Sequence, residues 1–333
     1  MNEKHLTWFK QFCEFELQTG GPDPHMRAVV ELCKDQTVEE QVWRALLYVG
    51  VYNVPSAEAI WRKWPIGEYQ RYPHLIEHWL DENWAGIKTR RERRTTNSPI
   101  KLARYLENYN TVMRSLDDLA VASFEDVWRF SMSLSSVGRY AATKIVEIFH
   151  RLGLTKAQHI DIRAKGGWSP RLALNLIFSD DVQDARDDSR DQIELAEQRA
   201  IQVQFDLAKR NLVLSIFELE VLLCEYKACY SSHRQYPGRS LDSELNYEKK
   251  IAAHWNLFTE TEHMKVRKLI SPSWALGEIQ GWDPKERLDN LGSVLANYGY
   301  IWSDSLYSYK DTTDFADPVK KVIMCSQGKP WNG

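Results

Sequence analysis

The strongest constraint on this fold is the spacing of its apolar residues, which recur every three or four positions over most of the chain. Residues 38–52, VEEQVWRALLYVGVY, place Val38, Val42, Leu46 and Val49 at this spacing. Such spacing puts the side chains on one face of an α-helix. Stretches in which apolar and polar residues alternate strictly, as in strands, are short and rare. The pattern therefore predicts an all-α fold.

Serines mark several expected helix starts, because a serine hydroxyl can accept a hydrogen bond from the free backbone N–H groups of a first helical turn. We expect helices to start at Ser56 and at Ser98, where Pro99 takes the first helical position. A third is expected at Ser123, which precedes Asp126 by three residues as in a loose capping box.

The overall composition is that of an ordinary globular protein. Of 333 residues, 43% are apolar and 27% charged, and the net charge is only -3. No apolar run approaches the roughly 20 residues of a membrane helix, and the N-terminus lacks a signal-peptide pattern. Five scattered cysteines without metal spacing indicate a reducing, intracellular compartment.

The chain is expected to divide into four parts. We predict an N-terminal helical segment over residues 1–36 and a main helical domain over 37–180. A helical extension over 181–260 and a loop-rich tail over 261–333 complete the prediction. The part beyond 180 is therefore expected to be a C-terminal addition to the main helical core.

A short glycine turn joins two apolar helices in the middle of the chain. In SLSSVGRYAATKIVEIFHRLG, residues 133–153, Gly138 separates a helix that ends near Leu134 from one that starts near Tyr140. A helix start presents free N–H groups and a positive dipole end, and glycine has no Cβ to keep a phosphate away. The turn is compatible with a DNA-backbone clamp, and equally with an ordinary helical corner.

A cluster of basic residues precedes the expected helix at Ser98. Residues 88–104 hold seven basic residues and one acidic residue, a net charge of +6 in a protein of net charge -3. Such a run is commonly a solvated face, but its position also favours contact with DNA phosphates.

One further motif resembles a metal site. His74, Glu77 and His78 match the H-x-x-E-H pattern of certain zinc peptidases. Pro73 directly precedes the motif, and no third ligand is evident, so we expect no metal there. Cys224 and Cys229 also lack partner ligands and are expected to be buried thiols.

The order of these features resembles the helix-hairpin-helix DNA glycosylase superfamily. In that superfamily an Asp at the mouth of the base pocket follows the glycine turn by about twenty residues, and here Asp161 follows Gly138 by 23. The resemblance implies a glycosylase-like helical core over residues 37–180 with a C-terminal helical extension. Tyr140 occupies the slot of the Schiff-base lysine of bifunctional glycosylases, and the four-cysteine iron–sulfur pattern of many relatives is missing.

Four stretches resemble a narrower family. They are GIKTRRERRTTNSPIKLARYL (86–106), VGRYAATKIVE (137–147), DIRAKGGWSPRLAL (161–174) and LLCEYKACYSSHRQYPGRSLDSEL (222–245). In this order they are similar to the α-glutamyl/putrescinyl-thymine pyrophosphorylases, or amino acid:DNA transferases, of bacteriophages with hypermodified thymine.

The resemblance implies that the enzyme flips a phosphorylated or pyrophosphorylated 5-hydroxymethyluracil out of double-stranded DNA and replaces the phosphate with an amine. The implied partners are DNA with this modified pyrimidine and an amino acid or polyamine, with no cofactor, metal or membrane, in the cytoplasm of an infected host. The residues also leave open a monofunctional DNA glycosylase and a non-catalytic DNA-binding protein.

The same resemblance implies a set of site residues. Asp161 is expected to deprotonate the amine or to stabilise positive charge at the methylene, although it can also be a helix-capping Asp. Tyr140, in the slot of the Schiff-base lysine, is the second residue assigned to the catalytic site. The leaving phosphate is assigned to Arg163, Lys165 and Arg171, and the amine donor to Glu225, Lys227, Tyr236, Arg239 and Asp242. DNA contacts are assigned to Lys88, Arg90, Arg91, Arg93, Arg94, Gly138, Arg139 and Lys144.

Overall fold

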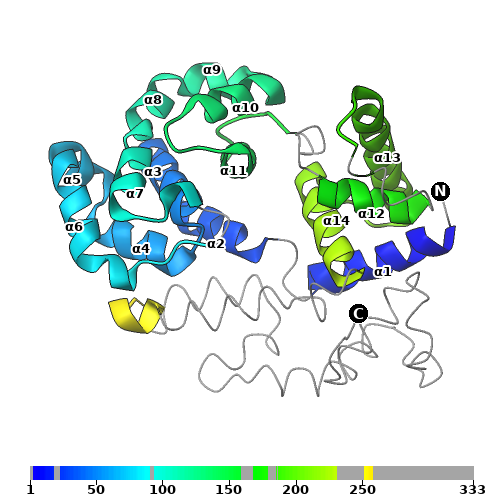
Figure 1. Ribbon diagram of the computed structural model, residues 1–333, viewed down its shortest axis with the longest axis horizontal. Coiled ribbons are helices and arrows are strands. Elements are labelled where there is room, and N and C mark those ends of the chain that lie inside the picture. Colours follow the sequence, from blue (N-terminus) through cyan, green and yellow to red (C-terminus); the bar gives the residue numbers. More distant parts are fainter. Residues whose placement is uncertain are drawn as a thin grey trace. The chain divides into compact units, whose positions relative to one another are not determined.

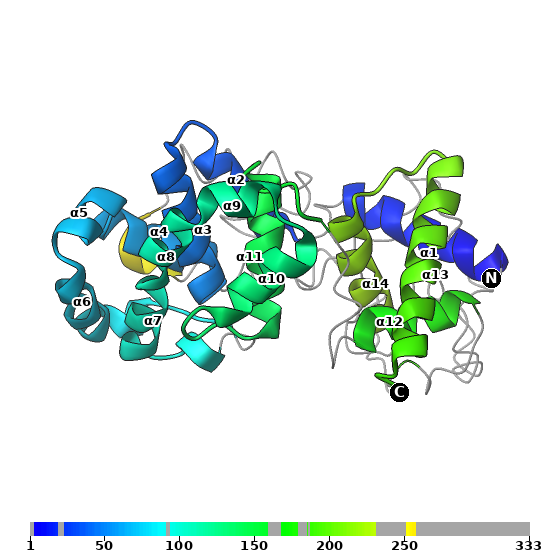
Figure 2. The same ribbon diagram turned by 90° about the horizontal axis from the view of Figure 1, so that it is seen from above.

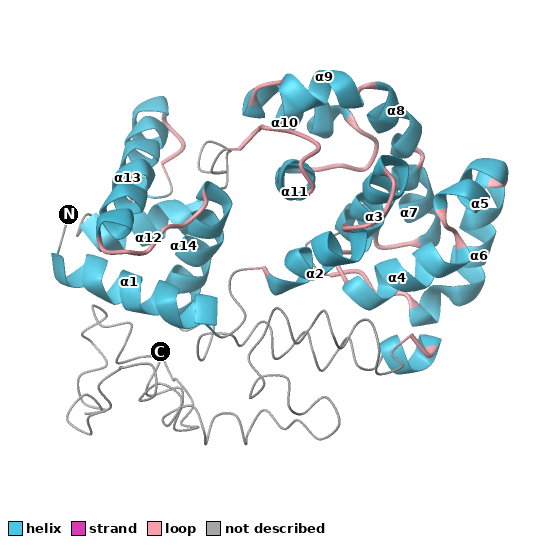
Figure 3. Ribbon diagram, turned by 180° about the vertical axis from the view of Figure 1, so that it is seen from behind, coloured by secondary structure: helices cyan, strands magenta, loops and turns pink. Residues whose placement is uncertain are grey.

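The fold is helical, as the apolar spacing predicts. The computed structural model describes residues 3–18, 23–90, 94–158, 168–178, 185, 187–230 and 251–257. Among these residues every regular element is a helix and none is a strand (Figure 3). The α-helices are α1 (Glu3–Gln18), α2 (Pro24–Cys33), α3 (Val38–Val51), α4 (Val54–Lys63), α5 (Ile66–Arg71), α6 (Ile76–Asn83), α7 (Pro99–Leu106), α8 (Asn108–Arg114), α9 (Leu116–Val121), α10 (Phe124–Ser133), α11 (Arg139–Arg151), α12 (Trp168–Phe178), α13 (Arg190–Lys209) and α14 (Ile216–Tyr230), with 3-10 turns η1 (Pro73–Leu75), η2 (Trp84–Gly86) and η3 (Arg94–Thr96).

The described helices form two compact units. Helices α2 to α11 and residues 251–257 make up the first, which we call the hairpin unit. Helix α1 and helices α12 to α14 make up the second, which we call the four-helix unit (Figure 1).

Helix α3 is the centre of the hairpin unit, and residues 42–51 of it are all buried. It packs against α4, α7, α8 and α11. The Trp43 ring stacks on Tyr69 with 4.3 Å between ring centroids, and it meets Tyr109 edge-on at 5.7 Å. Gly50 allows α7 to approach closely, since a Cβ at this position would lie 2.8 Å from Cε1 of Tyr105.

The helix starts partly follow the serine pattern. Ser123 caps α10 as predicted, because its Oγ accepts from the Asp126 N–H at 3.2 Å. Ser98 is the N-cap residue of α7, although its side chain makes no capping bond. The prediction for Ser56 is wrong: Asn53 caps α4, and its Oδ1 accepts from the Ser56 N–H at 3.0 Å. The asparagine takes the capping position because Val54 and Pro55 form the first helical turn.

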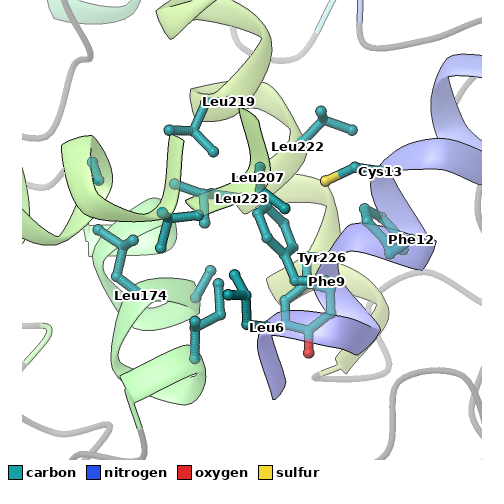
Figure 4. Close-up of a cluster of buried hydrophobic side chains, with 14 of the residues drawn as sticks. Leu6, Phe9, Phe12, Cys13, Leu174, Leu207, Leu219, Leu222, Leu223 and Tyr226 are labelled. Carbon is teal, nitrogen blue, oxygen red and sulfur yellow. The ribbon is translucent and has the colours of Figure 1, made fainter. Parts of the chain in front are cut away.

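The four-helix unit has an apolar core between α1, α12, α13 and α14 (Figure 4). Leu6 and Phe9 of α1 lie in it beside Leu222 and Tyr226 of α14. The Tyr226 ring meets Phe9 edge-on, with 5.1 Å between centroids. The first helix of the chain is thus held by residues more than 200 positions away.

Candidate nucleic-acid interface

The glycine turn lies between α10 and α11, which pack side by side (Figure 2). Ser136 in the turn has a left-handed backbone, with φ of 59°. Asn108 of α8 holds the turn at Ser135: its Nδ2 donates to the Ser135 carbonyl at 2.8 Å, and its Oδ1 accepts from the Ser135 N–H at 2.9 Å. The buried amide therefore fixes where the turn begins.

Gly138 is the N-cap residue of α11, and no side chain makes a capping bond there. Its φ of -103° and ψ of 175° are open to any residue. A Cβ at Gly138 would meet no atom of the described residues within 4 Å. Neither the backbone conformation nor the packing of the protein requires glycine here. Because glycine has no side chain, an anion can approach the first N–H groups of α11, a helix of 13 residues.

The basic stretch after residue 87 is attached to α3 and α4 through its backbone and one side chain. The Lys88 N–H donates to Ser56 Oγ at 2.8 Å, and the Arg90 N–H donates to the Val51 carbonyl at 3.1 Å. Thr96 Oγ1 donates to the Gly50 carbonyl at 2.6 Å. Ser56, expected to cap a helix, instead anchors this basic segment.

Tyr52 joins the basic segment to the hairpin. The Arg90 guanidinium lies 4.7 Å from the centroid of the Tyr52 ring, a cation–π distance. The Tyr140 ring of α11 meets the same ring edge-on, with 5.7 Å between centroids. Sequence reasoning missed Tyr52. Tyr52 follows α3 with a left-handed φ of 51°. Tyrosine rarely adopts this conformation, so the sequence gives no sign of it.

A buried charge network lies one turn further along α11. Lys144 is 4% exposed, and its Nζ lies 2.7 Å from Glu147 Oε2. The other Glu147 oxygen accepts from Arg151 Nη2 at 2.9 Å. The Lys144 ammonium also lies 5.9 Å from the centroid of the Tyr140 ring. The Lys144 side chain is therefore buried in the hairpin unit and paired with Glu147. Its contact with DNA stays a prediction.

The remaining predicted DNA-binding residues are placed only in part. Lys88 is exposed, and Arg90 and Arg139 are half-buried. Arg94 begins η3, while Arg91 and Arg93 lie outside the described residues.

Of the predicted catalytic residues, Tyr140 lies in α11 of the hairpin unit. The predicted substrate-binding residues fall in the four-helix unit or outside the described residues. Arg171 is 2% exposed; its Nε donates to the Ala185 carbonyl at 3.0 Å, and its Nη2 pairs with Asp188. Glu225 and Lys227 belong to α14, where Glu225 is half-buried. Outside the described residues lie Asp161, Arg163, Lys165, Tyr236, Arg239 and Asp242.

The described part of the chain contains no cluster of metal ligands. None of its residues form a group of three His, Cys, Asp or Glu side chains that could hold a metal ion. In the H-x-x-E-H motif, His78 Nε2 lies 3.3 Å from Glu82 Oε1. Over the same residues, no helix is both long and apolar enough to cross a membrane.

The chain matches a family of known proteins. A family model described as amino acid:DNA transferase matches residues 18–236. No curated protein and no solved structure matches the chain.

Proposed function

Starting from the fact that the chain belongs to the amino acid:DNA transferase family, we propose how it acts on DNA. It flips a phosphorylated or pyrophosphorylated 5-hydroxymethyluracil out of the duplex and exchanges the phosphate for an amine. The amine comes from an amino acid or a polyamine. The observation that carries the proposal is the contact of Tyr52 with both Arg90 and Tyr140, because it joins the basic segment to the hairpin in one unit.

The duplex is held through its phosphates, without reading of the base sequence. The open start of α11 at Gly138 supplies backbone N–H donors and the positive end of a helix dipole. Lys88 and Arg90 supply positive charge, and both have backbones fixed to the end of α3 or the start of α4. A rigid arrangement loses less conformational entropy on binding than mobile side chains do.

In the proposed reaction the lone pair of a neutral amine forms a C–N bond to the 5-methylene carbon of the base. The C–O bond to the phosphate or pyrophosphate breaks, and the leaving group takes the electron pair. Asp161 accepts the proton that the amine loses. Tyr140 borders the base, where its phenol is a poor nucleophile at neutral pH, so no covalent enzyme–DNA intermediate is part of the reaction.

The leaving group and the donor are assigned to the segments around α12 and α14. Arg163 and Lys165 stabilise the departing negative charge. For Arg171 the proposed role is indirect, because its guanidinium already pairs with Asp188 and fixes the start of α12. The donor is held by Glu225 and Lys227 of α14 together with Tyr236, Arg239 and Asp242.

The test is a nucleoside analysis of treated DNA. Duplexes with 5-phosphomethyluracil or its pyrophosphorylated counterpart are incubated with the protein and a mixture of amino acids and polyamines, digested, and analysed by mass spectrometry. We expect an intact aminated nucleoside. Abasic sites would instead identify a glycosylase, and unchanged DNA would identify a binding protein; either result overturns the proposal.

Variants test the role of the carboxylate. Asp161→Asn keeps the shape of the side chain and removes its charge, so the yield of aminated nucleoside should fall at least about a hundredfold. Asp117→Asn, which changes an exposed carboxylate in the first turn of α9, is the matched control and should retain full yield.

A further inference from the structure

A cavity of about 500 Å³ opens on the hairpin unit, away from the Tyr52 contact. It lies between the start of α3, the helix α5 and the helix α8. Its volume is in the usual range for small-molecule sites. The lining residues are Glu39, Gln70, Tyr109, Asn110, Met113 and Arg114.

The inner wall of the cavity is apolar with one buried hydroxyl. Tyr109 is 1% exposed, and its buried hydroxyl has no hydrogen-bond partner among the residues that the structure describes. A buried hydroxyl of this kind is uncommon, because it has lost its water without gaining a protein partner. Burial, with the nearby charges of Glu39 and Glu40, raises the pKa of Tyr109 to about 12. The phenol therefore keeps its proton at neutral pH and can act as a donor.

The outer wall carries both signs of charge. Glu39 is exposed in the first turn of α3, and Arg114 is exposed at the end of α8. Arg114 Nε donates to the Asn110 carbonyl at 3.2 Å, which tethers the guanidinium while its two terminal nitrogens remain available as donors. Within the described part of the chain, no ion pair joins Glu39 to Arg114. A carboxylate and a guanidinium beside an apolar wall suit a small zwitterion.

We propose that this cavity binds a free amino acid as its zwitterion. The ammonium group pairs with Glu39, the carboxylate with Arg114, and the side chain lies against Met113 and the Tyr109 ring. The choice of an amino acid among zwitterions rests on the proposed function. Glu39 and Tyr52 lie at opposite ends of α3, about 20 Å apart at 1.5 Å per residue. The cavity is therefore separate from the contact of Tyr52 with Tyr140. It is a second amino-acid site besides the donor site.

Binding is measured on the full chain by ligand-observed NMR with each of the twenty common amino acids, followed by calorimetry for the tightest. The decarboxylated amine and the deaminated acid of that amino acid are the matched probes. Each lacks one charged contact and should bind at least about tenfold more weakly. Absence of binding by all twenty amino acids, or binding of both matched probes as tight as that of the amino acid itself, overturns the proposal.

Two variants locate the site. Glu39→Gln and Arg114→Gln change exposed side chains and should each weaken binding at least about tenfold. Arg129→Gln removes the same charge as Arg114→Gln from an exposed residue of α10 and should leave the affinity unchanged. Wild-type affinity in both cavity variants would refute the site.

The outcome is separable from that of the proposed function. If the wild-type protein aminates DNA but both cavity variants bind amino acids normally, only the cavity proposal fails. If amino acids bind in the cavity and the DNA is never aminated, only the proposed function fails.

Discussion

The end of α3 and the start of α11 belong to the same unit, yet glycine has opposite consequences in the two places. At Gly50 the protein itself fills the space, since a Cβ would lie 2.8 Å from the Tyr105 ring. At Gly138, no atom in the described part of the chain lies within 4 Å of the corresponding position. The difference separates a position that the protein fills with its own side chains from a position that it leaves open, where we propose that a DNA phosphate binds. Substitutions should therefore change stability in the first region and DNA binding in the second.

The largest effect on the packed region is expected from alkaline pH. Burial, the main cause, raises the pKa values of Cys33, Tyr69 and Tyr109 from 9.0 or 10.0 to about 12. Between the ordinary and the raised value the folded state holds protons that the unfolded state has lost. Stability is thus complete below about pH 9 and falls as the pH rises toward 12.

Each unit of pKa shift corresponds to about 1.4 kcal/mol. Deprotonation of these three groups should therefore lower the free energy of unfolding by more than about 5 kcal/mol by pH 12. Urea unfolding followed by circular dichroism between pH 7 and 11 measures this loss. Tyr109→Phe removes one titrating group and a hydroxyl without a partner, so its curve should fall less steeply. If the free energy of unfolding of the variant falls with pH as steeply as that of the wild type, the raised pKa of Tyr109 is contradicted.

The next largest effect is expected at Glu147, the shared acceptor of the buried network in α11. Glu147→Gln leaves the Lys144 ammonium buried without its counter-charge, which should lower the free energy of unfolding by about 3–5 kcal/mol. Asp188→Asn is the matched change in the four-helix unit. The Asp188 side chain is 32% exposed, so water reaches the place of the lost carboxylate, and Arg171 keeps its hydrogen bond to the Ala185 carbonyl; the loss should therefore be smaller. If urea unfolding shows that Asp188→Asn loses as much free energy of unfolding as Glu147→Gln, or more, this prediction is wrong.

A smaller effect is expected from the two glycines themselves. Gly50→Ala should lower the free energy of unfolding by about 1–2 kcal/mol, because overpacking against Tyr105 outweighs the gain in helix propensity. Gly138→Ala should change stability by less than about 1 kcal/mol and weaken duplex binding about tenfold through loss of access to the helix N–H groups.

Urea unfolding and fluorescence anisotropy with a duplex measure the two properties. Gly67→Ala is the control, because its Cβ also meets nothing within 4 Å and it lies in α5, away from the hairpin turn. It should leave duplex binding unchanged. If Gly138→Ala binds DNA like Gly67→Ala, the space at Gly138 is not a phosphate site.

The smallest effect is expected in the salt dependence of DNA binding. Lys88→Ala with Arg90→Ala should reduce the slope of log affinity against log salt by about 0.9 per lost phosphate contact. Arg71→Ala with Arg129→Ala removes the same charge from exposed residues that pair with neighbouring acids. Binding titrations over a range of salt should show an unchanged slope for this control, and a similar slope for both doubles would make the basic segment a solvated face.

The amino-acid spacing was sufficient to predict the helical fold, the cap at Ser123 and the position of the glycine turn, and the motif order was sufficient to predict the family. These features depend on residues within a few positions of one another or on short motifs. The prediction at Ser56 failed because the serine and Asn53 compete as caps, and the choice between them involves Lys88, 32 residues further on.

The site itself was predictable only in part. Arg90 and Tyr140 were singled out from charge and motif, but Tyr52, which contacts both, carries no local signal. The cavity was missed for the same reason, because Glu39 and Arg114 come from helices that are distant in sequence.

By itself, the sequence determined which segments are helices, since that depends on side chains three or four residues apart. Only the tertiary structure decided which helices meet: α1 with α14, the basic segment with α3, and α3 with α8 around the cavity. Such contacts depend on how complementary apolar faces pack, and packing is a property of the whole unit rather than of any one stretch of chain.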